Sequence, residues 1–500
     1  MSEEAELQKN GVEDNLSVGA KGGAIAFLLK MGATLFGFLN QILLARMLGA
    51  GGLGEVLLAI SVARTAASLA KFGFEETMMR FVAEFVENKD SSRLKGVIFF
   101  SIKFSFLLSV ILAALVWIFS ELIALGIFHS ENVMKLLPIV AVSIPATVIR
   151  EVTGGILKGY KDTRKALIPE SVIAPVIKIG LFLLLMLQGI SPLYAVVAYI
   201  AGEIAAALFS VSYLRKRIKL LGNVLPKCDR KHILSVAYTI IFTGMTVLLY
   251  TQADLWILGV YRSTEIVGIY GVAARIVILI YFPMMAFATI IPPLISSVHA
   301  AGDHKELRKI VMESTRWILS IAMPVVLVFM FEGRLILKIL YGANFEAGYI
   351  VLLILCVAQL IKAASGLVGT ILQMTGEHKV YMKINIVMGV LNVLLNLLLV
   401  PSYGMLGAAV ASAICLALVD ITGVIVIYKR LSIISLARGI WFDIVFISLV
   451  IAVYFATVTW WNDTAVHLVL FVSLFAYIYK SIVAHDIPWK LLLNGLKKRS

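Results

Sequence analysis

The chain has 500 residues, of which 60% are hydrophobic and 15% charged, and its formal net charge is +14. A typical soluble domain is about 45–50% apolar and about 25% charged, so this composition excludes a water-soluble globular protein. The three cysteines, Cys228, Cys356 and Cys415, exclude a disulfide scaffold. In a membrane protein, excess positive charge is typical of cytoplasmic loops, so we expect no nucleic-acid partner.

Fourteen long apolar segments follow one another along the chain. A membrane-spanning helix needs about 20 mostly apolar residues, and long runs without a period of two favour helices over a β-barrel. We therefore predict an all-α polytopic membrane protein with about 14 transmembrane helices. The predicted spans are 18–47, 53–74, 94–120, 134–157, 166–188, 192–214, 233–261, 265–295, 309–331, 346–373, 380–400, 404–428, 439–459 and 465–483.

The basic residues are unevenly distributed between the loops. If the N-terminus is inside and the spans alternate, 29 of the 44 basic residues fall on inside segments and five on outside segments. This skew is typical of cytoplasmic loops. We therefore predict a multi-pass protein of the cell membrane with both termini cytoplasmic. Residues 1–15 are acidic rather than basic, which argues against a cleavable signal peptide.

The two halves of the chain resemble each other at a shift of 213 to 215 residues. GILKGYKDT (155–163) lies opposite TILQMTGEH (370–378), for example. Repeats of the same orientation predict two six-helix lobes related by a pseudo-two-fold axis, with a substrate site between them. The predicted organisation is an N-terminal cytoplasmic tail (1–17), an N-lobe (18–217), an inter-lobe loop (218–232), a C-lobe (233–430), and helices 13 and 14 with a basic tail (431–500).

Several ionisable residues lie deep inside predicted spans, where each costs about 2.5–3.5 kcal/mol on insertion scales. Such groups face a wet cavity or each other, although a cation can also snorkel or hold the bundle together in an ion pair. Because the cations outnumber the acids, we predict a positively charged cavity. The cations are Lys30, Arg64, Arg150, Lys178, Arg275, Lys362 and Lys383, and the acids are Glu151, Glu203, Asp254 and Asp420.

A positive cavity favours an anionic ligand. Arginine grips phosphate or pyrophosphate bidentately and lysine adds a point charge, while apolar walls suit a lipid tail. The chain has no GxxxxGK[ST] motif for an ATP motor, and its histidines lack metal-ligand spacing. We therefore expect a transporter rather than an enzyme, with no catalytic residue, no metal and no cofactor. A membrane-embedded glycosyltransferase or polymerase stays open, although no exposed loop offers an acid/base pair for it.

Three segments carry a family resemblance: ARMLGAGGLGEVLLAISVA (45–63), RFVAEFVENKDSSRLKGVI (80–98) and ADLWILGVYRSTEIVGIYGVAARI (253–276). They resemble the polysaccharide transporter (Wzx/RfbX-like oligosaccharide flippase) branch of the multidrug/oligosaccharidyl-lipid/polysaccharide (MOP) superfamily, which is related to MATE exporters and MurJ lipid II flippases. The resemblance implies two six-helix lobes, alternating access and outward transport of lipid-linked oligosaccharide. In MurJ-like proteins, basic residues on helices 1, 2 and 8 serve the diphosphate, and Lys30, Arg64 and Arg275 occupy those helices here.

The leading hypothesis is a flippase for a polyprenyl- or dolichyl-linked (pyro)phosphate sugar. The seven cations would line the path of the phosphate, and Asp254, Glu203, Glu151 and Asp420 would serve ion coupling or charge balance. Coupling to a proton or sodium gradient or to the membrane potential is open. The expected partners are the lipid-linked anionic sugar, membrane lipid, and glycosyltransferases or a polymerase of a polysaccharide pathway.

Two other functions stay open. An ion-coupled MATE-type multidrug exporter would expel cationic dyes in dependence on Asp254 or Glu203. One major MATE branch carries an acid on helix 1, whereas this chain has Lys30 there, which argues against this reading. A non-transporting scaffold of a glycan-assembly complex would tolerate neutralisation of all the interior bases.

Overall fold

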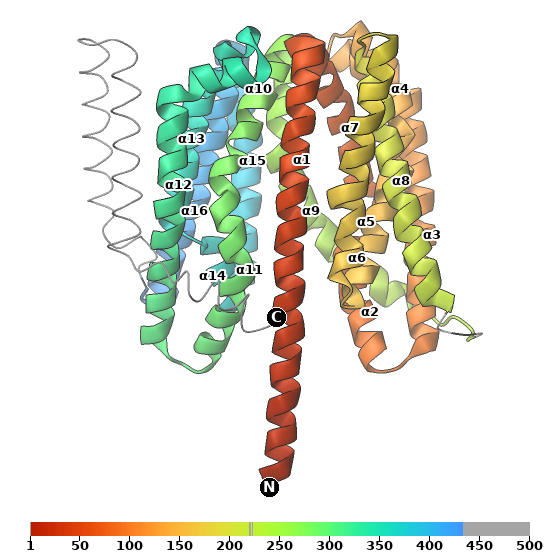
Figure 1. Ribbon diagram of the computed structural model, residues 1–500, viewed down its shortest axis with the longest axis vertical. Helices are drawn as coiled ribbons and strands as arrows, with labels where there is room; N and C mark the ends of the chain where they lie inside the picture. Colours follow the sequence, from red (N-terminus) through yellow and green to blue (C-terminus); the bar gives the residue numbers. More distant parts are fainter. Residues whose placement is uncertain (1, 220–221, 223, 434–500) are drawn as a thin grey trace. The chain divides into compact units, whose positions relative to one another are not determined.

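The computed structural model describes residues 2–219, 222 and 224–433 (Figure 1). Every regular element in that part of the chain is a helix, which confirms the predicted all-α fold. Nine of these helices are long and apolar enough to cross a membrane, or up to ten if the bent pair Glu131–Ala141 and Ser143–Gly159 forms one span. The predicted spans 439–459 and 465–483 and the basic tail lie outside the described residues.

The elements follow one another with short connections. They are α1 (Ser2–Ala70), α2 (Phe74–Glu87), α3 (Ser91–Ile118), η1 (Leu122–Ile127), α4 (Glu131–Ala141), α5 (Ser143–Gly159), α6 (Thr163–Ile168), η2 (Pro169–Ile173), α7 (Ala174–Leu185), η3 (Met186–Gln188), α8 (Pro192–Lys219), α9 (Arg230–Tyr261), α10 (Thr264–Ile276), α11 (Ile278–Ala300), α12 (His304–Tyr341), η4 (Ala343–Gly348), α13 (Tyr349–Ser365), α14 (Val368–Met374), α15 (His378–Tyr403) and α16 (Met405–Leu431).

The helix α1 contains the first predicted span, 18–47, and most of the second, 53–74. Its two arms meet at Gly49, whose φ of 68° and ψ of −177° interrupt the helical backbone. Glycine adopts such angles without the steric penalty that a Cβ would bring. The predicted span 265–295 is likewise divided, because α10 ends at Ile276 and α11 begins at Ile278. The amphipathic helix α2 was not predicted, since its polar residues read as a loop.

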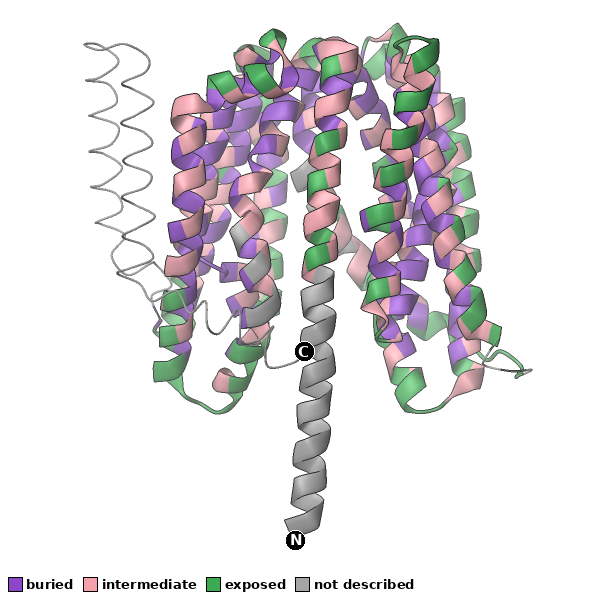
Figure 2. Cartoon of the chain, viewed as in Figure 1, coloured by how far each residue is buried: buried purple, intermediate pink, exposed green. Residues whose placement is uncertain are grey.

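The outward face of α3 carries exposed residues (Figure 2). Leu107 and Ile111 are 53% and 55% exposed, whereas Ser101, Ser105 and Ser109 on the same helix are buried. A soluble protein rarely exposes so much contiguous apolar surface. Small polar residues are typical of contacts between membrane helices, because they let the backbones approach closely. The exposed side of α3 is therefore suited to lipid.

The chain forms two compact units. The first comprises Met1–Arg275, Leu337–Gly348 and Ile386–Ser412, and the second comprises Ile276–Ile336, Tyr349–Asn385 and Ala413–Ser500. The division into lobes at 18–217 and 233–430 stays a prediction, as does the cytoplasmic position of the termini.

Candidate functional site

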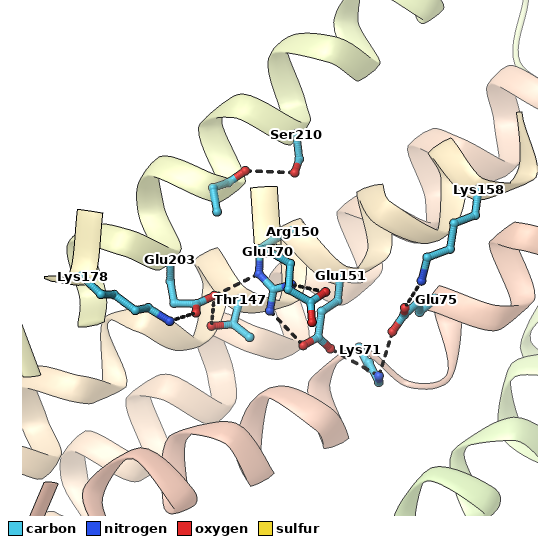
Figure 3. A network of polar contacts seen from close by, with 11 residues as sticks. Lys71, Glu75, Thr147, Arg150, Glu151, Lys158, Glu170, Lys178, Glu203 and Ser210 are labelled. Atoms are coloured by element: carbon cyan, nitrogen blue, oxygen red, sulfur yellow. Dashed lines mark hydrogen bonds and ion pairs between the residues drawn. The ribbon is translucent and has the colours of Figure 1, made fainter. Parts of the chain in front are cut away.

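A network of alternating charges runs through the first unit, from the turn after α1 across α2, α5, η2, α7 and α8 (Figure 3). Its centre is Glu203 on α8, whose side chain is 5% exposed. The carboxylate accepts hydrogen bonds from Lys178 Nζ at 2.7 Å, Arg150 Nε at 3.0 Å and Thr147 Oγ1 at 3.3 Å. A buried carboxylate with two cationic donors is well compensated in a membrane interior.

Arg150 links this centre to two further carboxylates. Its guanidinium also donates to Glu151 at 3.2 Å and to Glu170 at 3.3 Å. Glu170 lies in the π-helical turn η2, and π-helical turns are frequent at functional positions. Arginine serves several acceptors at once because its guanidinium carries five N–H donors in a planar fork.

The other end of the network lies where α1 passes into α2. Glu75 pairs with Lys71 at 3.0 Å and with Lys158 at 2.8 Å, and Lys71 reaches Glu151 at 3.3 Å. The helices α2 and α5 can come this close because Gly155 has no side chain. A Cβ at that position would lie only 2.1 Å from the carbonyl oxygen of Glu75. The bare backbone at Gly155 thus allows the contact that brings Lys158 to Glu75.

The network is electrically balanced. It contains four cations and four carboxylates, so its formal charge is zero. We predicted Arg150 and Lys178 as phosphate ligands, but the structure pairs both with carboxylates, and we no longer assign the anion to them. The cations are Lys71, Arg150, Lys158 and Lys178, and the carboxylates are Glu75, Glu151, Glu170 and Glu203.

Arg64 and Arg275 lie outside this balance. Neither makes a hydrogen bond or ion pair in the structure to a residue of the described part of the chain, and the Arg64 side chain is exposed. The charge of Arg64 acts on Arg275, while Tyr199, Glu203 and Glu151 act on Arg64. Two neighbouring guanidinium groups repel each other unless an anion lies between them or beside them.

The packing of α10 against both arms of α1 places Arg64 and Arg275 within range of each other's charge. On the second arm, a Cβ on Gly54 would lie 1.7 Å from the carbonyl oxygen of Thr264. On the first arm, Gln41 donates from Nε2 to the carbonyl oxygen of Gly271 at 3.0 Å. Arg275 follows Gly271 by one helical turn, so its guanidinium reaches the first arm as well.

The remaining predicted cations lie elsewhere. Lys30 is exposed on the first arm of α1, where no ion pair to a described residue holds it. Lys362 and Lys383 belong to the second unit, where Lys362 Nζ lies 4.6 Å from the centre of the Tyr281 ring. The charge of Lys362 also acts on the buried Asp420. A single chamber shared by all seven cations stays a prediction.

Asp254 on α9 lies at the centre of a second buried site in the first unit. Its carboxylate accepts hydrogen bonds from Tyr270 Oη at 2.6 Å, from Asn396 Nδ2 at 2.8 Å and from the Ser412 hydroxyl. No Lys or Arg that the structure describes pairs with it. The Oδ1 atom of Asn396 is buried and accepts no hydrogen bond from a described residue. Asp254 is thus a buried carboxylate that is bound only by neutral donors of the described residues.

The sequence offered only part of these two sites. The stripe Asn392 and Asn396 is visible from its spacing of four, but Tyr270 and Ser412 lie far from Asp254 along the chain and give no local signal. Glu170 was missed because it lies near the beginning of the predicted span 166–188, where a charged residue is expected at the membrane surface.

The long apolar helices and the charges paired between them are those of a polytopic helical membrane protein. The model of the family described as "Polysaccharide biosynthesis protein" matches residues 20–299, more than half of the chain, and the MatE model matches residues 239–398. The chain therefore belongs to the polysaccharide biosynthesis protein family. The resemblance to the polysaccharide branch of the MOP superfamily is confirmed.

Individual relatives agree with this family. The chain is 27% identical to the "Probable low-salt glycan biosynthesis flippase Agl15" of Haloferax volcanii over 34% of this chain and 36% of that protein. It is 24% identical to the "Putative O-antigen transporter" of Shigella flexneri over 74% of this chain and 88% of that protein. The alignment with the Haloferax protein thus spans about a third of that relative's length.

Solved structures share the fold. The "Lipid II flippase MurJ, inward closed conformation" is similar with a TM-score of 0.71 and 18% identity, over 93% of this chain and 99% of that chain. An inward-facing MATE family transporter is similar with a TM-score of 0.66 and 18% identity, over 82% of this chain and 98% of that chain. These likenesses confirm the predicted MATE/MurJ-like fold.

Proposed function

We propose that this protein is a flippase that moves a lipid-linked oligosaccharide, joined to its polyprenyl or dolichyl carrier by a phosphate or pyrophosphate, across the cell membrane by alternating access. The family match and the relatives named as flippases support this proposal. Both termini would lie in the cytoplasm, and glycosyltransferases or a polymerase of the pathway would supply or use the cargo.

The choice of an anionic cargo depends on one observation, the pair of arginines Arg64 and Arg275. Two arginines within membrane helices that lack an ion-pair partner among the described residues cost about 5–7 kcal/mol on insertion scales, before their mutual repulsion and the attraction of Glu203 and Glu151 for Arg64 are counted. A phosphate between them would remove much of this cost, because guanidinium and phosphate form paired, charge-assisted hydrogen bonds. Lys30, on the first arm of α1, would add a further positive charge on the path of the anion.

A reconstituted transport assay tests this function. Purified protein in proteoliposomes is given a labelled polyprenyl-diphosphate oligosaccharide, and the outer leaflet is probed with a reagent that cannot cross the bilayer. We expect Arg64→Gln combined with Arg275→Gln to reduce flipping at least tenfold. The matched control is Lys103→Gln, which removes an exposed cation from α3. Wild-type flipping by the double variant would overturn the proposed anion site.

Asp254 is the proposed site of the coupling ion. Oxygen donors suit hard cations, and a buried carboxylate held only by neutral donors gains most from a cation or a proton. The unpartnered Asn396 Oδ1 supports this assignment, because a bound cation would give that oxygen a partner.

Imposed gradients separate sodium from proton coupling. In the same proteoliposomes, either a sodium gradient or a pH gradient should accelerate flipping by the wild type. Asp254→Asn should abolish that acceleration and leave the binding of polyprenyl diphosphate unchanged. Glu306→Gln, which removes an exposed acid from the first turn of α12, is the control. An undiminished gradient response in Asp254→Asn would contradict the assignment.

A further inference from the structure

The last residue of α12, Tyr341, buries a hydroxyl group without a partner. The side chain is 1% exposed, and its Oη atom has no hydrogen-bond partner among the residues that the structure describes. A buried tyrosine hydroxyl normally finds a partner, since leaving it unpaired costs free energy that a phenylalanine would not. The Tyr341 hydroxyl therefore adds nothing to the stability of the fold that a phenylalanine would lack.

The surroundings hold this side chain firmly in place. Arg46 on the first arm of α1 donates to the carbonyl oxygens of Ile339 and Leu340, which satisfies the exposed end of α12. The Tyr341 ring packs edge-on against Phe38, with ring centres 6.1 Å apart. Because the ring is fixed by these contacts, the hydroxyl has little freedom to seek another partner.

Arg275 lies close to the Tyr341 side chain. Phe38 follows Gly37, and a Cβ on Gly37 would lie 2.5 Å from Arg275 Nη2. The charge of Arg275 acts on the Tyr341 hydroxyl. The neighbouring residues Gly37 and Phe38 thus place one guanidinium and one hydroxyl at the same level of α1. Both groups are donors, and the guanidinium has no acceptor atom to offer in return.

We propose that the Tyr341 hydroxyl donates a hydrogen bond to an oxygen of the same lipid-linked phosphate or pyrophosphate that Arg275 binds. Position 37 is a glycine because any side chain there would displace the guanidinium from this anion. The inference rests on the proposed function of Arg64 and Arg275, and it adds a neutral donor that fixes the orientation of the phosphate.

The decisive variant is Tyr341→Phe, which removes only the unpartnered oxygen. Binding of polyprenyl diphosphate should weaken about tenfold or more, because a hydrogen bond to a charged group is lost. The melting temperature without lipid should stay the same or rise, since a buried unpaired polar atom disappears. Tyr160→Phe is the matched control, because the Tyr160 hydroxyl is also buried without a partner and its ring lies beside Arg217 instead.

A second variant tests the role of the glycine. Gly37→Ala should weaken the same binding, because its Cβ would force the Arg275 side chain to move. Gly32→Ala on the same arm is its control, since a Cβ at that position meets no atom within 4 Å. Inorganic pyrophosphate, used as a competitor of the lipid, separates recognition of the phosphate from recognition of the tail. The competitor should lose affinity for Tyr341→Phe by the same factor as the lipid.

The outcomes are distinguishable from failure of the function itself. If Arg275→Gln loses affinity but Tyr341→Phe binds like the wild type, the anion site stands and the role of Tyr341 is overturned. If Tyr341→Phe lowers the melting temperature and leaves binding intact, the residue is structural and the inference is overturned. If Arg275→Gln also binds like the wild type, both the anion site and this inference fall. A loss seen for the lipid but not for pyrophosphate would overturn the assignment to phosphate oxygens.

Discussion

Replacing Glu203 by glutamine should strongly destabilise the first unit. The pair with Lys178 at 2.7 Å corresponds to an attraction of about 6 kcal/mol at an effective dielectric constant of about 20, much of which offsets the desolvation of the two ions. Removing the shared carboxylate leaves Lys178 without a carboxylate partner in the described network. Breaking a buried pair from one side costs about 3–5 kcal/mol, and we expect Glu203→Gln to fall in this range.

The same network supplies the comparison. Glu170 also pairs with Arg150, but its side chain is 61% exposed, so Glu170→Gln should cost only about 0–1 kcal/mol. Denaturant titration of the purified variants in mixed micelles measures both changes. The double variant Glu203→Gln with Lys178→Gln should cost less than the sum of its single variants, because the second change removes the unpaired ammonium group. Equal costs for Glu203→Gln and Glu170→Gln would refute the reasoning.

Two further predictions concern packing and pH. Gly268→Ala should cost about 1–3 kcal/mol or more by the same titration, because its Cβ would lie 2.0 Å from the carbonyl oxygen of Ala50. Gly51→Ala, whose Cβ would meet no atom within 4 Å, should instead stabilise the helix by about 0.5–1 kcal/mol. Equal effects of the two substitutions would contradict the close approach of Gly268 to Ala50. Burial raises the pKa of Asp162, between α5 and α6, but the hydrogen bonds and charge of Lys165 outweigh it and the pKa is lowered. The stabilising effect of Asp162 is therefore complete above its unfolded pKa of about 3.9 and is lost as the pH falls through its lower folded pKa. Asp162→Asn should therefore reduce the loss of stability at acid pH in a profile of unfolding free energy against pH. An unchanged loss at acid pH would contradict the pairing of Asp162 with Lys165.

The helices could be predicted because the bilayer leaves the backbone few choices. A spanning segment must satisfy its own N–H and C=O groups, so a long apolar run is sufficient evidence for a helix. The breaks were less visible. Gly49 interrupts α1, but it is one of several neighbouring glycines, so the sequence does not show which of them breaks the helix. The helix α2 contains polar residues such as Arg80 and Glu84, which obscure its helical pattern in the sequence.

The pairing of charges could not be predicted from spacing along one helix. Glu203 lies 53 residues from Arg150 and 25 from Lys178, and only the packing of α5, α7 and α8 brings the three together. From the sequence alone, Arg150 and Lys178 are therefore predicted as phosphate ligands in the same way as Arg64 and Arg275. The structure separates the two pairs by a single criterion, which is whether a carboxylate lies within ion-pair distance.

Equilibrium binding of polyprenyl diphosphate and of the uncharged polyprenol, to the wild type and to the single variants Arg64→Gln and Arg275→Gln, tests the central claim most directly. The account predicts that each arginine variant loses about tenfold or more in affinity for the diphosphate and none for the polyprenol, since a charge-assisted hydrogen bond to phosphate is lost in each case. Equal affinity of the wild type and both variants for the diphosphate would contradict it.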